Sequence, residues 1–286
     1  MCARLALLFV AACGGGSTTT HVPEPTPHAI SAAFESSWRN VGYSFSYLAP
    51  ADPAVYASGA VDVIFHFHAG HAAESEYRAA APHAVVVDIT VPGFGTTPYW
   101  KLMDDPDRFD RWKSMLVADL SQHAGKPIAI HRIALVAWSA GYVTVQRILM
   151  NKKHYDEVDA VVLLDGLHCG YVHNTPTRRA DLAVLSPFVR FAKDAETGKK
   201  LFVFTHSSIQ TYTDGYASTT EVADALAPEL GMTWTQDARP GPNGAIRSAD
   251  LGDVHLRGFA GEQPKDHVIH DHFIGTIVKT WLEPRW

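Results

Sequence analysis

Residues 133–150 place one serine at the junction between a strand and a helix. Residues 133–137 are all apolar and predict a buried strand, and residues 142–150 have a helical composition. Between them lies the turn 137–141, with the sequence AWSAG, in which the small residues Ala137 and Gly141 bracket Ser139. A strand that turns this sharply into a helix projects the hydroxyl of the turn residue above the end of its sheet. We therefore interpret Ser139 as a nucleophile.

Apolar runs alternate with helical patterns along most of the chain. This alternation predicts an α/β fold with a mostly parallel central sheet and helices on both faces, a three-layer α/β/α sandwich. Functional residues in such sheets follow the carboxyl ends of the strands. The expected strands are 41–49 (an edge strand), 61–67, 84–91, 133–137, 158–165, 200–206 and 253–260, and the expected helices are 72–81, 106–123, 142–150, 178–195, 219–230 and 264–282.

The composition fits one domain of this kind. The chain has 286 residues, of which 47% are hydrophobic, and a chain of this length buries a sizeable core. Its formal net charge of −6 gives no indication of a nucleic-acid partner. We assign residues 31–286 to this α/β domain.

The first residues have the pattern of an export signal. Arg4 supplies a positive charge, and residues 5–12 form an apolar stretch too short to span a bilayer. The stretch runs into VAAC, residues 10–13, which resembles the lipobox of bacterial lipoproteins. The resemblance implies that residues 1–12 are a lipoprotein signal peptide and that a lipid such as palmitate is attached to Cys13.

The segment after Cys13 suits a membrane tether. Residues 13–30 are rich in Gly, Ser, Thr and Pro, a composition typical of flexible linkers. We therefore expect the domain to be anchored to a membrane of the bacterial cell envelope, facing the periplasm or the exterior. If Cys2 is removed with the signal and Cys13 is lipidated, Cys169 has no partner for a disulfide. A plain signal peptide with a chance cysteine is the alternative.

Further features accompany the turn at Ser139. The loop 68–71, with the sequence HAGH, follows one expected strand, acidic residues follow later strands, and the histidine-rich segment 266–272 begins the last helix. Over residues 40–286 this arrangement resembles the α/β-hydrolase fold of serine hydrolases such as bacterial esterases and lipases. In that family the nucleophile, the acid and the histidine occur in this chain order. The resemblance implies hydrolysis of a small-molecule carboxylic ester through an acyl-enzyme intermediate, with no cofactor and no metal; an amide or peptide is the alternative substrate.

The resemblance leaves alternatives for the acid and for the base. For the acid we favour Asp165, which ends an apolar strand, over Asp214, which stands in an Asp-Gly turn signal. For the base we favour His267, which falls where the loop meets the last helix, over His270, which lies one turn later. In each case the base takes the proton from Ser139 and the acid orients the imidazole.

The resemblance also implies an oxyanion hole made of two backbone N–H groups. The first belongs to Ala140, the residue after the nucleophile, and the second comes from the loop 68–71. Small residues in that loop let the backbone approach a substrate closely. We expect the second donor from Ala69, with Gly70 and His71 as alternatives.

Two other functions compete with the serine mechanism. His66, His68 and His71 resemble the His-x-His-x-Asp-His run of metallo-β-lactamase-fold hydrolases, in which zinc activates a water. Gly70 stands where that run has its aspartate, which removes one metal ligand. The second alternative is a lipoprotein of the same fold that binds a ligand without turnover.

Overall fold

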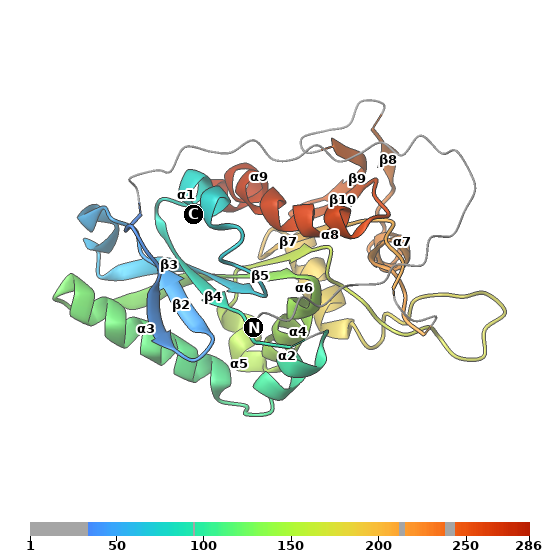
Figure 1. Cartoon of the computed structure of the whole chain (residues 1–286). Coiled ribbons are helices and arrows are strands. Elements are labelled where there is room, and N and C mark those ends of the chain that lie inside the picture. The colour runs from blue at the N-terminus through green and yellow to red at the C-terminus, as the bar shows by residue number, and fades with distance from the viewer. Residues whose placement is uncertain (1–33, 94, 212–214, 238–243) are drawn as a thin grey trace, which may run out of the picture.

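The computed structural model describes residues 34–93, 95–211, 215–237 and 244–286. These residues form one sheet with helices on both sides (Figure 1). The predicted signal peptide (residues 1–12), the predicted tether (residues 13–30, with Cys13) and Asp214 lie outside the described residues. In spatial order the strands are β1 (Arg39–Gly42), β2 (Phe45–Leu48), β4 (Ala84–Ile89), β3 (Ala60–Phe67), β5 (Ala129–Trp138), β6 (Ala160–Leu164), β7 (Leu201–His206), β10 (Val254–Phe259), β9 (Ala245–Leu251) and β8 (Thr235–Gln236).

The centre of the sheet is parallel and its edges are antiparallel. The strands from β4 to β10 in the spatial order run in one direction, whereas β2 and β9 pair antiparallel with them and β1 and β8 extend the two edges. Strands covered on both faces must be apolar throughout, and every residue of β6, with the sequence AVVLL, is buried. The predicted mostly parallel sheet is confirmed.

Two separate hydrophobic clusters fill the spaces between the sheet and its helical layers. Figure 1 shows α1 and the C-terminal helices on one side of the sheet and α3 with α4 on the other. This arrangement confirms the predicted three-layer sandwich. The first side carries α1 (Glu74–Ala80), α8 (Pro264–Val268), η4 (Ile269–Phe273), α9 (Ile274–Ile277) and η5 (Val278–Leu282), and the second carries α2 (Thr97–Leu102), α3 (Arg108–Ala124), α4 (Tyr142–Met150), α5 (Lys152–Glu157), α6 (Ser186–Glu196) and α7 (Thr219–Glu229).

Several elements differ from the sequence expectations. The stretch 41–49 is not one edge strand but part of the hairpin β1–β2, and the polar segment 231–250 contains β8 and β9. β9 buries only Ala245 and Ala249, so its apolar pattern is weak, and antiparallel pairing with β10 stabilises it instead. The last helix is interrupted, because η4 has 3-10 and η5 has π geometry. The helix expected from residue 178 begins only at Ser186, since Pro187 suits a first turn.

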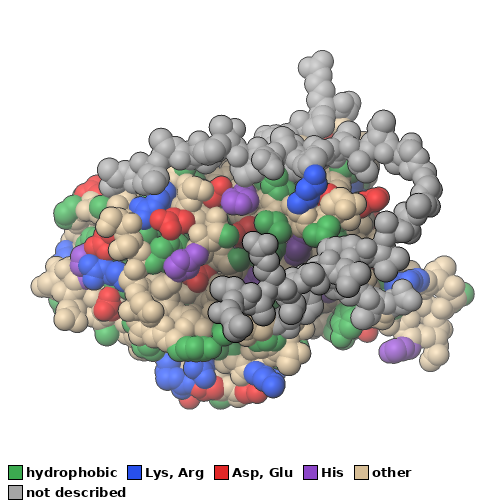
Figure 2. All heavy atoms as spheres, viewed as in Figure 1, with side chains coloured by type: hydrophobic (Ala, Val, Ile, Leu, Met, Phe, Trp, Pro, Cys, Tyr) green, Lys and Arg blue, Asp and Glu red, His purple; other side chains and the backbone are tan. Residues whose placement is uncertain are grey.

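Charges of both signs are interspersed on the face of the molecule shown in Figure 2. Lys and Arg side chains lie beside Asp and Glu side chains over much of the visible, described surface. In the described part of the chain, no helix is both long and apolar enough to cross a membrane.

The parallel strands end at one edge of the sheet and bring the predicted site residues there. His68 directly follows β3, Ser139 follows β5, and Asp165 follows β6. Ser207 directly follows β7, and α8, which contains His267, begins a few residues after β10. Residues from five separate segments of the chain therefore meet at this edge.

Candidate active site

Ser139 occupies a left-handed turn at the end of β5. Its φ is 50°, a region that non-glycine residues rarely adopt. The short 3-10 turn η2 (Ser139–Gly141) leads directly from this residue into α4, so the strand, turn and helix expected around the serine are present. Ser139 is partly exposed, whereas the five residues from Ile133 to Ala137 are buried.

Close backbone contacts require glycine at two positions beside this turn. A Cβ on Gly141 would lie 2.2 Å from the carbonyl oxygen of Phe67, and a Cβ on Gly166 would lie 2.3 Å from that of Ser139. Both distances are well below van der Waals contact, so neither position admits a side chain. Ala137, by contrast, fits at the first small position of the turn with none of its surface exposed.

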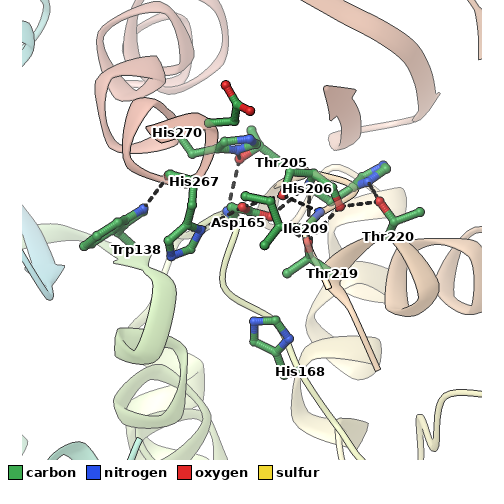
Figure 3. Close-up of polar contacts among 12 residues, drawn as sticks. Trp138, Asp165, His168, Thr205, His206, Ile209, Thr219, Thr220, His267 and His270 are labelled. Atoms are coloured by element: carbon green, nitrogen blue, oxygen red, sulfur yellow. Dashed lines mark hydrogen bonds and ion pairs between the residues drawn. The ribbon is translucent and has the colours of Figure 1, made fainter. Parts of the chain in front are cut away.

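The carboxylate of Asp165 is held by four hydrogen bonds. Its Oδ1 accepts from the Ser207 backbone N–H at 2.9 Å and from the Thr219 hydroxyl at 2.5 Å. Its Oδ2 accepts from the Ser207 hydroxyl at 2.7 Å and lies 2.8 Å from Nδ1 of His267 (Figure 3). Asp165 is 2% exposed and has a positive φ of 46°, so its position at the end of β6 is fixed by these partners.

The surroundings of Asp165 keep its carboxyl group ionised. Burial acts to raise the pKa, but the neighbouring imidazoles of His270 and His267 and the hydrogen bonds from His267 and Thr219 lower it further than burial raises it. The net effect holds the pKa of Asp165 well below its ordinary value. The site therefore presents a buried negative charge to the imidazole of His267.

His267 lies between the carboxylate of Asp165 and the ring of Trp138 (Figure 3). Its ring faces that of Trp138, with centroids 4.8 Å apart and planes inclined by 31°, and the Trp138 indole N–H donates to the His267 carbonyl at 3.0 Å. Because Nδ1 of His267 faces Asp165, its Nε2 is the nitrogen left to exchange a proton with another group. Trp138 directly precedes Ser139, so the imidazole lies beside the residue that precedes the predicted nucleophile.

The alternative base, His270, is placed differently. It has no exposed surface, and its Nδ1 lies 2.8 Å from the hydroxyl of Thr205. The rings of Phe259 and Phe273 lie about it, with centroids 5.1 and 5.0 Å away. Burial lowers the pKa of His270 to about 4, so it is a neutral core residue behind Asp165.

The amides of the loop after β3 are already hydrogen-bonded. The Ala69 N–H donates to the Thr90 hydroxyl at 2.8 Å, and the Gly70 N–H donates to Asp88 Oδ1 at 2.7 Å. The sequence predicted a free donor at Ala69, and this bond to Thr90 was not foreseen because it depends on a neighbouring strand. Ala140, in contrast, lies in the first turn of a helix, where N–H groups have no intrahelical acceptor.

The three histidines proposed as zinc ligands turn toward separate partners. His66 is fully buried and contacts Tyr77 at 2.8 Å through Nδ1, whereas Nε2 of His71 contacts the Ser46 hydroxyl at 2.8 Å. Nδ1 of His68 lies 2.6 Å from the Tyr99 hydroxyl. Among the described residues no group of three or more His, Cys, Asp or Glu side chains could hold a metal ion. The structure does not assemble the alternative zinc site.

Sequence reasoning missed the groups that support Asp165. Ser207 follows β7, and Thr219 begins α7, where Ser218 and Glu221 form a capping box. The S-T-T-E run at 218–221 was a readable helix-start signal that fixes where Thr219 lies. His168, also missed, points its ring toward Asp165 and His267 (Figure 3) and contacts the Ala217 carbonyl at 3.0 Å through Nδ1.

Comparisons with known proteins bear on the fold. No family model and no curated protein matches the sequence. A solved structure of the enterobactin esterase FES from Shigella flexneri is similar, with 13% identity and a TM-score of 0.54, over 91% of this chain and 61% of that one. The S-formylglutathione hydrolase FrmB from Staphylococcus aureus (12%, TM-score 0.45) matches over 87% of this chain and 98% of its own, and carboxyl esterase 2 from Tuber melanosporum (12%, TM-score 0.45) over 89% of each. At 13% identity the likeness to FES concerns the fold alone, and with the mostly parallel sheet described above that fold is the α/β-hydrolase fold.

Proposed function

We propose that this protein is a serine hydrolase that cleaves a carboxylic ester through an acyl-enzyme intermediate. The observation that carries the proposal is the 2.8 Å contact between Nδ1 of His267 and Oδ2 of Asp165, beside the left-handed turn at Ser139. A buried carboxylate that orients an imidazole next to a partly exposed serine in a turn is the arrangement that activates a hydroxyl for acyl transfer.

In the proposed mechanism the Ser139 hydroxyl attacks the ester carbonyl while Nε2 of His267 takes its proton. Asp165 stabilises the imidazolium that forms and keeps Nδ1 protonated. The Ala140 N–H, at the start of the helical turn, donates to the oxyanion. His267 then returns the proton to the leaving alcohol, and a water molecule activated by His267 releases the acid.

An ester is favoured over an amide because an alkoxide is the better leaving group. The similar solved structures include proteins described as esterases, among them the enterobactin esterase and carboxyl esterase 2. We therefore propose a small-molecule ester as the substrate.

The test is a panel of p-nitrophenyl esters of increasing acyl length, with a p-nitroanilide series beside it. The wild-type protein is expected to hydrolyse at least one ester, and Ser139→Ala is expected to lose this activity. Ser114→Ala, at an exposed serine on α3, is the matched control and is expected to keep the ester-hydrolysing activity.

A fluorophosphonate probe should label the wild type and Ser114→Ala but not Ser139→Ala. Ester hydrolysis that persists in Ser139→Ala would contradict the serine mechanism, and folded wild type without turnover or labelling would favour the ligand-binding alternative.

We further propose that the mature protein is a lipoprotein anchored at the cell envelope through Cys13. The support is the VAAC sequence at residues 10–13 after a short apolar stretch. Expression in a bacterium with an alkyne-bearing palmitate analogue should label the wild type and Cys169→Ser, but not Cys13→Ser. Labelled protein should also partition into detergent on phase separation. Equal labelling of Cys13→Ser would overturn the anchor without affecting the proposed chemistry.

A further inference from the structure

The loop that should supply the second oxyanion donor turns its amides toward β4. The Ala69 N–H donates to the Thr90 hydroxyl, which in turn donates to Asp88 Oδ1 at 2.8 Å. The same carboxylate oxygen accepts the Gly70 N–H. Both backbone N–H groups are therefore hydrogen-bonded within one network, which consists of the Thr90 hydroxyl and the carboxylate of Asp88 in β4.

This arrangement is tightly packed and costly to undo. A Cβ on Gly70 would lie 2.7 Å from Asp88 Oδ1, so the loop backbone rests directly on the carboxylate. Asp88 is only 6% exposed, and withdrawing its donors would leave a buried carboxylate oxygen with fewer hydrogen bonds. The two amides therefore hold the loop in place and do not donate to a developing oxyanion. The oxyanion needs another donor.

The side chain of His68 lies beside Trp138, the residue before the predicted nucleophile. β3 and β5 are neighbouring parallel strands in which Phe67 is opposite Ala137, so His68 comes next to Trp138 at the sheet edge. The two rings lie 4.9 Å apart at 31°. His68 has a left-handed φ of 78° and is partly exposed, unlike the buried residues of β3 before it.

Tyr99 determines which nitrogen of His68 carries the proton. The phenol is 1% exposed, and its oxygen hydrogen-bonds the Val91 backbone and lies 2.6 Å from Nδ1 of His68. A buried hydroxyl needs an acceptor for its own proton, and among the described residues Nδ1 of His68 is the acceptor within reach. With Nδ1 accepting, a neutral imidazole carries its hydrogen on Nε2.

The imidazole of His68 is neutral at pH 7. Burial, together with the neighbouring His66 and His267, lowers its pKa to about 4. A neutral ring with a fixed Nε2–H is a hydrogen-bond donor that does not exchange its proton with the oxyanion, and a neutral histidine can polarise a carbonyl in this way.

We propose that the Nε2–H of His68 is the second donor of the oxyanion hole, acting with the Ala140 N–H. The inference rests on the proposed serine mechanism and adds one catalytic residue to it. No proton is transferred: the Nε2–H bond stays intact and stabilises the negative oxygen of the tetrahedral intermediate. Tyr99 is then a positioning residue, since it acts through the tautomer of His68.

The test compares two substitutions at one position. His68→Phe preserves a planar ring against Trp138 but has no N–H, and it should lower kcat for the best p-nitrophenyl ester by about 10²- to 10³-fold, with KM little changed. His68→Gln, whose side-chain amide can donate, should recover a large part of that loss. An inhibitor that forms a tetrahedral adduct, such as a trifluoromethyl ketone, should lose affinity for His68→Phe in proportion to kcat/KM.

Tyr99→Phe tests the tautomer separately. This variant removes the phenol hydroxyl that keeps Nδ1 of His68 a hydrogen-bond acceptor. Because His68 is still in place, the expected loss of kcat is smaller than in His68→Phe. Thermal unfolding of each variant tests whether it is folded. If His68→Phe does not fold, the comparison of kcat between His68→Gln and Tyr99→Phe tests the donor role of His68 instead.

The results distinguish this inference from the proposed function. If Ser139→Ala is inactive but His68→Phe keeps kcat within about threefold of wild type, the oxyanion donor is not His68 while the serine mechanism stands. If His68→Phe and His68→Gln lose activity equally, a donor role is likewise overturned. If wild type hydrolyses no ester, both proposals fall together.

Discussion

The imidazole Nδ1 of His267 lies 2.8 Å from Oδ2 of Asp165, although the two residues are 102 positions apart in the chain. Their elements, α8 and the end of β6, meet at the edge where the parallel strands end. Ser207 and Thr219 hold the same carboxylate through three further hydrogen bonds. The carboxylate of Asp165 is thus fixed by the scaffold, and it can hold the imidazole of His267 in one orientation.

Asp165→Asn is predicted to lower kcat about 10³- to 10⁴-fold for an ester substrate. An amide at this position no longer stabilises the imidazolium and can hold His267 in the wrong tautomer. The measurement is kcat and KM with a p-nitrophenyl ester, together with thermal unfolding, because Asn also disturbs the hydrogen bonds from Ser207.

Asp214→Asn is the matched comparison, because Asp214 is the alternative acid. We expect this variant to keep nearly all of its activity. If Asp214→Asn is inactive and Asp165→Asn retains more than a third of kcat, the acid has been assigned to the wrong strand.

Gly141→Ala and Gly166→Ala are predicted to disrupt the turn at Ser139. The new methyl groups would lie 2.2 and 2.3 Å from backbone oxygens of Phe67 and Ser139, and neither oxygen can move without shifting a strand end. We expect a lower midpoint in urea unfolding and a large loss of fluorophosphonate labelling. Gly125→Ala is the control: a Cβ there meets nothing within 4 Å, although its φ of 65° adds a backbone strain that Gly141, with a φ of −60°, does not have. A variant of Gly141 with wild-type stability and labelling would contradict the prediction.

The sequence predicted the centre of the fold well because buried parallel strands have a strong signal. The apolar runs that became β3 to β7 are bounded by turn residues and cannot be exposed, so few alternatives exist. The end of α3 was also readable, since Gly125 takes the left-handed conformation that closes the helix. The turn at Ser139 joins such a buried strand to a helix through small residues, which is why the nucleophile could be predicted from the sequence.

Other features depend on contacts that no local pattern records. β9 has only two buried residues and exists because β10 pairs with it. His267 and His270 are one turn apart, and each stands between an aspartate and an apolar residue, so only the packing against Phe259 and Phe273 shows that His270 is buried. The hydrogen bond from the Ala69 amide to Thr90 joins residues just after β3 and just after β4, and it could not be predicted from either segment alone.

The stability of the fold is predicted to fall as the pH is lowered from about 6.5 to 4. Burial lowers the pKa of His270 to about 4, whereas an unfolded histidine has a pKa near ~6.5. Between these values the unfolded chain binds a proton that the folded protein excludes, so stability is complete above the window and is lost through it. Asp165, whose pKa is held below its ordinary value, adds a loss in the same direction at still lower pH.

Urea unfolding at several pH values measures this effect. His270 alone should contribute on the order of 2 kcal/mol between pH 7 and pH 4.5. His270→Phe removes the titrating group, so its stability should depend less steeply on pH, whatever its stability at pH 7. His173→Gln, at an exposed histidine, should keep the wild-type slope. Parallel pH curves for wild type and His270→Phe would show that His270 does not couple folding to protonation.

Trp138 is predicted to position His267 for proton transfer. Its indole N–H donates to the His267 carbonyl, and its ring lies between the imidazoles of His68 and His267 at 4.9 and 4.8 Å. Trp138→Phe keeps a ring but loses the hydrogen bond, and Trp138→Ala loses both. A displacement of a catalytic group by about 1 Å can lower the rate about 10²-fold. We therefore expect kcat to fall modestly in Trp138→Phe and by nearly that factor in Trp138→Ala. Trp281→Phe, at a tryptophan that stacks on His255 near the start of β10, is the control and should keep wild-type kcat. Equal activity of all three variants in a p-nitrophenyl ester assay would show that the ring and its N–H do not orient the base.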